Sequence, residues 1–466
     1  MPAKAEFAGA VGGEVTGSGT FLTLTGGSRV LVDFGLYQGY GGNGRNKDLS
    51  KINTDNVSAI IVTHAHADHV GRLPLLNQLL KSNVPIYMTK ATAEITKVAL
   101  KDAARLFRHL YPPESVGNIL KRIKTKEYDE VFKIDDNGAV ATFRDAGHIL
   151  GSAIAEIKDT DGKRYVFSGD LGNDSSSRIL KPPTLIKKAD YVFLESTYGD
   201  RLHPVEDPIE VLSEAVDFIK STNGTLLIPA FSIDRTQVAL HMLKIMRQKG
   251  LLRDKYGDEI PVHLDSPMAS KVTKIYREFP WLLKEEIQEE GQPFSFYGMS
   301  EMPRKGRRDK DKGPKIKRGG PKIIVSASGM MTGGRISEHA INYLPSDKNA
   351  LFLIGFAAQG TPAGAIMRGE KIIQIPRSID GKFSLVPVDV RARVLRTQAL
   401  SAHADQNQLV DWLSQIQDVK GVILNHGNQP AREALRQRIA EDLPAKRLWL
   451  PDHGTIIDFS QKEQAS

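Results

Sequence analysis

The chain has 466 residues, too many for one ordinary hydrophobic core, so we expect two domains. Its hydrophobic fraction of 40% and charged fraction of 25% are typical of a globular protein in water. There is no cysteine, which excludes disulfides, thiolate metal sites and cysteine nucleophiles. The N-terminus lacks the apolar core of a signal peptide and no stretch approaches a membrane span, so we expect a cytoplasmic protein with no membrane partner.

The net charge of +8 is concentrated in one segment. From Glu301 to Lys322 the sequence holds ten Lys or Arg and only three acidic residues. Glycine and proline interrupt this basic tract, Arg304–Lys322, so no regular element is expected in it. Two interpretations remain open: a solvated surface loop, or a tract that binds phosphate groups.

The first 200 residues alternate predicted strands with predicted helices, which indicates an α/β fold. Apolar, β-branched segments predict strands at 21–24, 29–33, 59–62, 85–88, 153–157, 165–167 and 191–194. Helical spacing predicts helices at 71–80, 91–107 and 207–220. A second α/β unit begins with strands at 225–229, 261–264, 323–326 and 350–354, and from about 394 the chain continues to a strand at 421–424.

The most informative motif is His64-Ala65-His66-Ala67-Asp68-His69, directly after the strand predicted at 59–62. Three imidazoles on one loop are improbable by chance in a chain with 12 histidines. Imidazole and carboxylate are ligands of zinc, and a short loop can present them to two metal ions. The motif therefore predicts a metal site at the carboxyl end of a strand, where α/β sheets place their sites.

Three further candidates each stand just after an apolar segment: His148, Asp170 and His426. Each alone would more often be an ordinary core or turn residue, but together with the first motif they predict one site. We assign His64, His66 and His148 to one ion. We assign Asp68, His69 and His426 to a second ion, with Asp170 bridging both. The net positive charge of such a centre suits an anionic substrate such as a phosphodiester.

These residues, with Asp33, resemble the ligand pattern of the metallo-β-lactamase fold. Further motifs narrow the resemblance to the β-CASP nucleases. The segments that match are Leu194–Arg201, Ser401–Asp405 and Asn425–Gly427. The branch in question contains the nuclease subunit of the eukaryotic cleavage and polyadenylation factor and its shorter bacterial and archaeal RNase relatives. The last motif departs from the family pattern, because Asn428 stands where the family has glutamate.

The resemblance implies an α/β fold: a metallo-β-lactamase αβ/βα sandwich formed by residues 1–202 and 394–466, with a β-CASP domain inserted at 203–393. It implies two zinc ions, and manganese in place of zinc remains open. It also implies that Glu195 orients His403, which donates a proton to the leaving group. Asp68 is expected to act in catalysis as well as in metal binding, and Asp33 to orient a metal-bound histidine.

Two loops after strands are candidate phosphate-binding segments. One carries Ser232 and Arg235 at the predicted start of a helix, where backbone amides and an arginine suit phosphate. The other carries Ser326, Ser328 and Gly329, and similar loops in the family contact nucleic-acid backbone. Simple helix capping is an equally good explanation at this stage.

The expected function is therefore a zinc-dependent ribonuclease that hydrolyses single-stranded RNA to 5′-phosphate and 3′-hydroxyl ends. Endonuclease action is the first expectation, and an accompanying 5′→3′ exonuclease activity remains open, as does a homodimer. The alternatives are a β-CASP nuclease acting on DNA, a non-enzymatic binding subunit, and a small-molecule hydrolase on the same fold.

Overall fold

The structure is a computed structural model that describes residues 2–39, 41–80, 83–106, 108–175, 179–302, 316, 319–355, 357–379, 382–444 and 446–460. Most of the basic tract, 303–315 and 317–318, lies outside the described residues. The chain forms two compact units. The first consists of Met1–Asp174, Leu180–Leu202 and Ala402–Ser466, and the second of Ser175–Ile179 and His203–Ser401.

Two seven-stranded sheets form the centre of the first unit. One has the order β22-β1-β2-β3-β4-β5-β6. Its strands are β1 Lys4–Gly9, β2 Gly19–Thr23, β3 Arg29–Val32, β4 Val57–Ile61, β5 Ile86–Thr89, β6 Ile123–Lys126 and β22 Ile456–Asp458. The other has the order β21-β20-β11-β10-β9-β8-β7. Its strands are β7 Val131–Lys133, β8 Val140–Asp145, β9 Ala153–Lys158, β10 Arg164–Phe167, β11 Tyr191–Glu195, β20 Gly421–Asn425 and β21 Arg447–Trp449.

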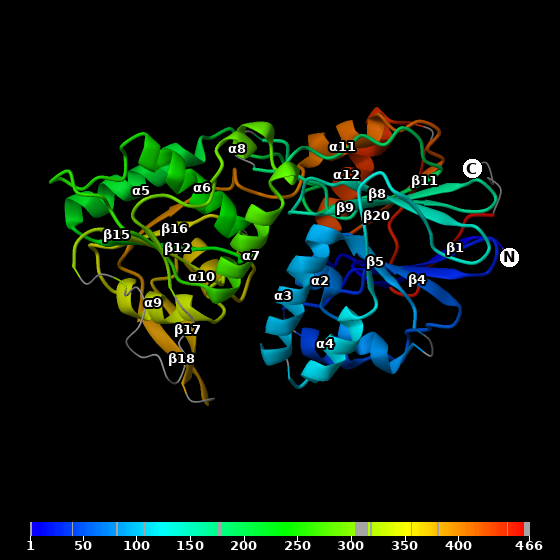
Figure 1. The fold of residues 1–466 in the computed structure, drawn as a ribbon, viewed down its shortest axis with the longest axis horizontal. Helices are drawn as coiled ribbons and strands as arrows, with labels where there is room; N and C mark the ends of the chain where they lie inside the picture. The colour runs from blue at the N-terminus through cyan, green and yellow to red at the C-terminus, as the bar shows by residue number, and fades with distance from the viewer. Residues whose placement is uncertain are drawn as a thin grey trace. The chain divides into compact units, whose positions relative to one another are not determined.

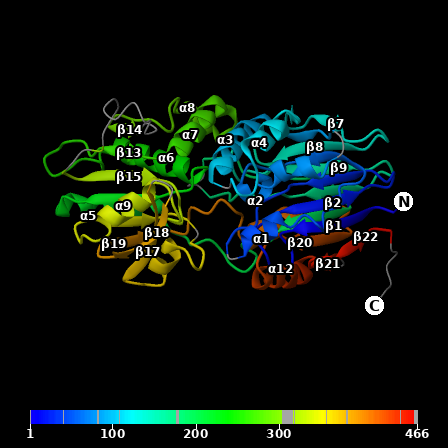
Figure 2. The same cartoon turned by 90° about the horizontal axis from the view of Figure 1, so that it is seen from below.

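Helices cover the outer faces of both sheets, and in Figures 1 and 2 α3 and α12 lie on opposite sides of the strands. The helices of this unit are α1 Gly42–Lys47, α2 Ala67–Val70, η1 Leu73–Gln78, α3 Lys90–Leu106, α4 Pro113–Leu120, α11 Gln406–Ser414 and α12 Gln429–Asp442. One apolar core lies between the sheets, and a further core lies under each helical layer. Each sheet thus buries both faces, which confirms the predicted αβ/βα sandwich.

Parallel strands bring the candidate residues to one edge of this sandwich. Strands β3 to β6 run parallel in the first sheet, as do β10, β11, β20 and β21 in the second. The carboxyl ends of β4, β10, β11 and β20 are each followed directly by candidate residues, because parallel strands end at the same edge. The turn from β8 to β9, residues 146–152, adds His148.

The second unit contains a six-stranded sheet of order β14-β13-β15-β12-β16-β19, with every pair parallel. Its strands are β12 Thr225–Pro229, β13 Val262–Leu264, β14 Met299–Glu301, β15 Lys322–Ser326, β16 Ala350–Leu353 and β19 Arg393–Arg396, and β17 Ile372–Ile379 with β18 Lys382–Asp389 forms a separate hairpin. Its helices are α5 Pro208–Thr222, α6 Arg235–Gln248, α7 Pro267–Glu278, η2 Pro280–Leu282, α8 Glu285–Glu289, α9 Arg335–Tyr343 and α10 Pro362–Met367. Helices α5 and α6 pack on one face of the sheet and α9 on the other (Figure 1).

Two local expectations differ from the structure. Within the helix predicted at 71–80, the structure has the 3₁₀ helix η1, Leu73–Gln78, rather than a regular helix, with Pro74 in its first turn. The chain also leaves the second unit later than position 394, because β19 pairs with β16.

None of the helices in the described ranges combines the length and the apolar character that crossing a bilayer requires.

Candidate metal centre

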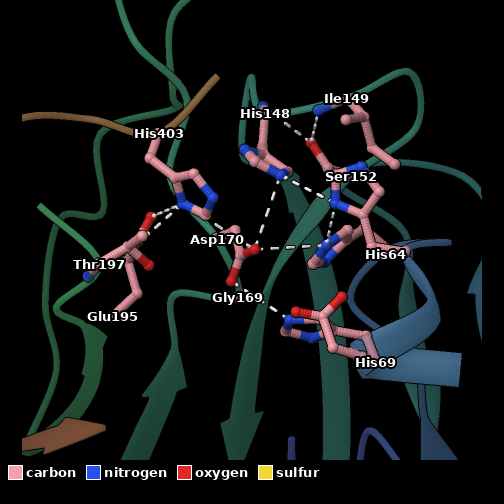
Figure 3. Close-up of polar contacts among 12 residues, drawn as sticks. His64, His69, His148, Ile149, Ser152, Gly169, Asp170, Glu195, Thr197 and His403 are labelled. Atoms are coloured by element: carbon pink, nitrogen blue, oxygen red, sulfur yellow. Dashed lines mark hydrogen bonds and ion pairs between the residues drawn. The ribbon is translucent and has the colours of Figure 1, made fainter. Parts of the chain in front are cut away.

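The first donor group consists of His64, His66 and His148, whose ring nitrogens lie close together. His66 Nδ1 lies 3.1 Å from His64 Nε2 and 3.2 Å from His148 Nε2. Asp170 Oδ2 lies 3.4 Å from His64 Nε2 and 3.6 Å from His148 Nε2. In Figure 3, Asp170 lies between the Glu195–His403 pair and the histidines of the centre.

The second donor group consists of Asp68, His69 and His426. His426 Nε2 lies 3.1 Å from His69 Nε2 and 3.6 Å from Asp68 Oδ2. The other carboxylate oxygen of Asp170, Oδ1, lies 3.4 Å from His69 Nε2 and 3.5 Å from His426 Nδ1. Asp170 therefore presents one oxygen to each donor group.

The donor atoms have the spacing of metal ligands. A tetrahedral ion bound at about 2.0–2.1 Å to nitrogen sets its ligand atoms about 3.3 Å apart. Burial lowers the pKa of His66 to about 4 and holds the pKa of His64 and His148 well below the ordinary value, so these rings are neutral at pH 7. Asp170 Oδ1 is buried and accepts no hydrogen bond from any described residue. Clustered neutral imidazoles around an unsatisfied buried carboxylate fit a metal site.

Asp33 and Thr63 hold two of the ligands in position. Asp33 accepts hydrogen bonds from the Thr63 amide at 2.8 Å and from its hydroxyl at 2.7 Å, and lies 2.8 Å from His69 Nδ1. The Thr63 hydroxyl also lies 3.1 Å from His64 Nδ1. Because Asp33 takes the Nδ1 side of the His69 ring, Nε2 faces the donor group, which is the orienting role expected of Asp33.

Glu195 and His403 form a hydrogen-bonded pair beside the first donor group. His403 Nδ1 lies 3.0 Å from Glu195 Oε1, whereas the nearest Asp170 oxygen is 4.0 Å away. Glu195 is fully buried and accepts hydrogen bonds from the amides of Leu171 at 2.9 Å and Thr197 at 3.1 Å. The His403 side chain is 19% exposed, so of the two it is the one that reaches solvent.

Comparison with known families agrees with this geometry. The metallo-β-lactamase superfamily matches residues 12–213, the β-CASP domain 236–366, and the zinc-dependent metallo-hydrolase RNA specificity domain 387–449. A ribonuclease from Thermus thermophilus is 34% identical over 440 residues, which cover 92% of this chain and 94% of that protein. This chain belongs to the β-CASP nucleases of the metallo-β-lactamase superfamily.

Other proteins are similar to this chain at lower identity. An RNase J-like protein from Methanocaldococcus jannaschii is 29% identical, covering 92% of this chain and 94% of that protein. Cleavage and polyadenylation specificity factor subunit 3-II from Arabidopsis thaliana is 25% identical, covering 96% of this chain and 71% of that protein. Among solved structures, a protein of unknown function from Enterococcus faecalis V583 has a TM-score of 0.54 at 14% identity and covers 98% of this chain and 100% of its own, which supports the fold alone.

In the β-CASP unit, the predicted phosphate-binding residues Ser232 and Arg235 follow β12. Arg235 is the first residue of α6, and its Nη1 lies 3.1 Å from the carboxylate of Asp234. Asp234 occupies the capping position, but its side chain makes no capping hydrogen bond. Ser232 is buried two residues before this capping position.

The second predicted loop divides into one structural residue and two accessible ones. Ser326 is fully buried, and its hydroxyl donates to the carbonyl of Asp265 at 2.8 Å, so the fold alone accounts for it. Ser328 is partly exposed and its hydroxyl accepts from the Thr332 amide at 3.0 Å. Gly329 permits close approach of the two loops, because a Cβ there would lie 3.0 Å from the ring of Phe231.

Several residues of the site were not predicted from the sequence. The hydroxyls of Thr63 and Thr197 both contact histidines of the two donor groups, His64 and His426. Thr63 directly precedes His64, and Thr197 lies two residues after Glu195. This nearness to a predicted site residue is the sequence signal that could have identified them. Asn428, the departure from the family motif, caps α12 by accepting from the Ala431 amide at 2.9 Å, so its side chain serves the helix.

The turn that carries His148 depends on Asp145. Asp145 Oδ1 accepts a hydrogen bond from the Gly147 amide at 2.8 Å. Burial raises the pKa of Asp145 to about 7. The folded protein therefore keeps this proton up to about pH 7, whereas the unfolded chain loses it near pH 4. Stability falls as the pH rises through this window, and the full penalty is present above it.

We predict that Asp145→Asn, which keeps an oxygen for Gly147 but cannot ionise, is more stable than the parent at pH 8 by about 2–4 kcal/mol, from about 1.4 kcal/mol per pKa unit. The difference should shrink toward pH 5. Urea unfolding of both proteins at the two pH values measures it. An equal difference at both pH values would show that ionisation of Asp145 is not its source.

We predict that Asp170→Asn loses most of the bound metal, because it removes the negative charge that faces both donor groups. Elemental analysis of the purified protein measures this. Asp159→Asn is the matched control, since Asp159 is also a buried carboxylate but binds Thr25 instead. Parental metal content in Asp170→Asn would remove Asp170 from the centre.

Proposed function

We propose that this protein is a metal-dependent ribonuclease that hydrolyses phosphodiester bonds of single-stranded RNA with two zinc ions. One observation carries the proposal: Asp170 presents one oxygen to each of two donor groups, and a hydrogen-bonded Glu195–His403 pair lies beside it. Such a centre can bind two ions and supply a proton. The relatives named as ribonuclease and RNase J-like protein support RNA as the substrate.

The chemistry of the ligands supports this assignment of the ions. The first donor group would hold one zinc through three imidazoles, and the second would hold another through Asp68, His69 and His426. Zinc bound there would supply Lewis-acid activation of a water molecule and of a phosphate oxygen. Manganese remains the alternative, because imidazole and carboxylate also bind it.

His403 is suited to protonate the leaving oxygen. Its Nδ1 faces Glu195 at 3.0 Å, so Nδ1–H donates to that carboxylate and Nε2 is left to carry the proton that is transferred. The buried carboxylate stabilises the imidazolium form before transfer. The two amides that bind Glu195 keep it from rotating away from His403.

The topology of the β-CASP unit offers a place for RNA phosphates. The chain leaves β12 toward α6 and leaves the neighbouring β15 toward α9, on opposite faces of the sheet. Such a switch point forms a crevice at the carboxyl ends of the strands, and it is where α/β sheets bind ligands. Ser232, Arg235, Ser328 and Gly329 stand on the two loops that border this point. We assign these four residues to phosphate binding and leave Ser326 out.

The function is tested with RNA and DNA oligonucleotides of the same sequence, labelled at the 5′ or the 3′ end. We expect cleavage of RNA only, loss of cleavage with a chelator, and recovery when zinc is added back. Internal products from both labels would indicate endonuclease action, and mononucleotides from the 5′ label would indicate the exonuclease. Equal cleavage of DNA would favour the alternative of a β-CASP nuclease that acts on DNA, and no cleavage of either would overturn the proposal.

We predict that His403→Ala keeps its metal and its RNA affinity but slows single-turnover cleavage roughly 10²–10⁴-fold, the usual effect of losing a general acid. A substrate with a more acidic leaving group needs less protonation, so it should recover most of the rate. Rapid-quench kinetics with both substrates measure this. If elemental analysis found metal missing from His403→Ala, the residue would be a ligand instead.

A further inference from the structure

Thr197 lies where two neighbouring parallel strands end. Strands β11 and β20 pair in register, with Glu195 opposite Asn425. Thr197 follows β11 by two residues, and His426 follows β20 directly. The pairing of these strands therefore brings Thr197 to the metal-binding histidine, although 229 positions separate them in the sequence.

The side chain and the amide of Thr197 contact both parts of the site. Its hydroxyl lies 3.1 Å from His426 Nδ1 and donates to the carbonyl oxygen of His426 at 3.1 Å. Its backbone amide donates to Glu195 Oε2 at 3.1 Å. One residue thus bonds to a ligand of the second donor group and to the partner of His403.

The count of protons determines the direction of these bonds. A hydroxyl has one hydrogen, and here it goes to the His426 carbonyl, which can only accept. The Thr197 oxygen is then an acceptor toward Nδ1, so Nδ1 carries the imidazole hydrogen and Nε2 keeps its lone pair. Nε2 is the atom that faces His69 and Asp68. The other acceptor near Nδ1, Asp170 Oδ1, is farther away at 3.5 Å.

The Thr197 hydroxyl also helps to stabilise an unfavourable backbone conformation at His426. His426 has a φ of 51°, in the left-handed region, which is unfavourable for a non-glycine residue. Three contacts hold this conformation: the His426 amide donates to Ala10, and its carbonyl accepts from the Ser196 amide and the Thr197 hydroxyl. Gly427 makes the approach possible, because a Cβ there would lie 2.6 Å from the Ser196 carbonyl oxygen.

We propose that Thr197 is a positioning residue that fixes the tautomer and the orientation of His426, and thereby sets the affinity of the second donor group for its metal ion. The inference rests on the two-ion function proposed above. It does not require that the substrate be RNA. A neighbouring hydrogen bond that orients a metal-bound histidine typically accounts for 10–100-fold in metal affinity.

The test compares Thr197→Val, which keeps the shape and loses the hydroxyl, with Thr197→Ser, which keeps the hydroxyl. Zinc is titrated into the metal-free proteins against a competing chelator, so that the affinity of each ion is resolved without measuring cleavage. We expect one ion to bind 10–100-fold more weakly in Thr197→Val and the other to be unchanged. Thr197→Ser should bind both ions within about threefold of the parent.

Ser196→Ala is the matched control, because the Ser196 hydroxyl is buried on the same loop and has no hydrogen-bond partner within the described ranges. It should bind both ions as the parent does. If Thr197→Val does not fold, as judged by thermal unfolding of the metal-free protein, Thr197→Ala is measured in its place. Parental affinity for both ions, or an equal loss at both, would overturn the proposal. Binding of fewer than two ions by the parent would instead contradict the two-ion function.

Discussion

The candidate metal centre depends on the contacts between the Asp170 carboxylate and the imidazoles around it. The carboxylate is fully enclosed and faces imidazoles on both sides. Burial opposes its ionisation, but the neighbouring His426 and His69 outweigh burial and hold the pKa of Asp170 well below the ordinary range. A buried negative charge is tolerated only when positive charge or several hydrogen bonds surround it. Metal ions meet this need permanently, whereas protonated histidines meet it only while they retain their protons.

The candidate metal ligands could be predicted because each follows a strand, and all except His148, which follows the antiparallel strand β8, follow a strand of the inner, parallel part of a sheet. Such strands are apolar throughout, so the sequence identifies them, and their carboxyl ends must meet at one edge. The histidine cluster at 64–69, His148, Asp170 and His426 all lay on predicted loops, and the structure brings them together. The fold followed from the same strands once the motifs had indicated the family.

The features that the sequence did not predict have weaker local sequence patterns. Strands β7, β21 and β22 have three residues each and lie at or beside sheet edges, so neither length nor alternation marks them. The predicted domain boundary near 394 precedes the end of the second unit at Ser401. The reason is that β19 has mostly exposed side chains and, among the described strands, pairs with β16 alone. Ser326 shared the composition of a phosphate-binding loop, but its hydroxyl bonds to a carbonyl from a distant strand end. Contacts of this kind depend on tertiary packing, which no local pattern contains.

The second donor group joins positions far apart in the chain. His69 and His426 are separated by 357 residues, and the whole second unit lies between them in the sequence. A metal ion bound by both would bind only the folded chain that brings the two histidines together, so its binding free energy would add to the free energy of folding. In a protein without a cysteine, such an ion would be a cross-link that takes the place of a disulfide. It would join the returning C-terminal segment to the N-terminal sheet at the proposed reaction site.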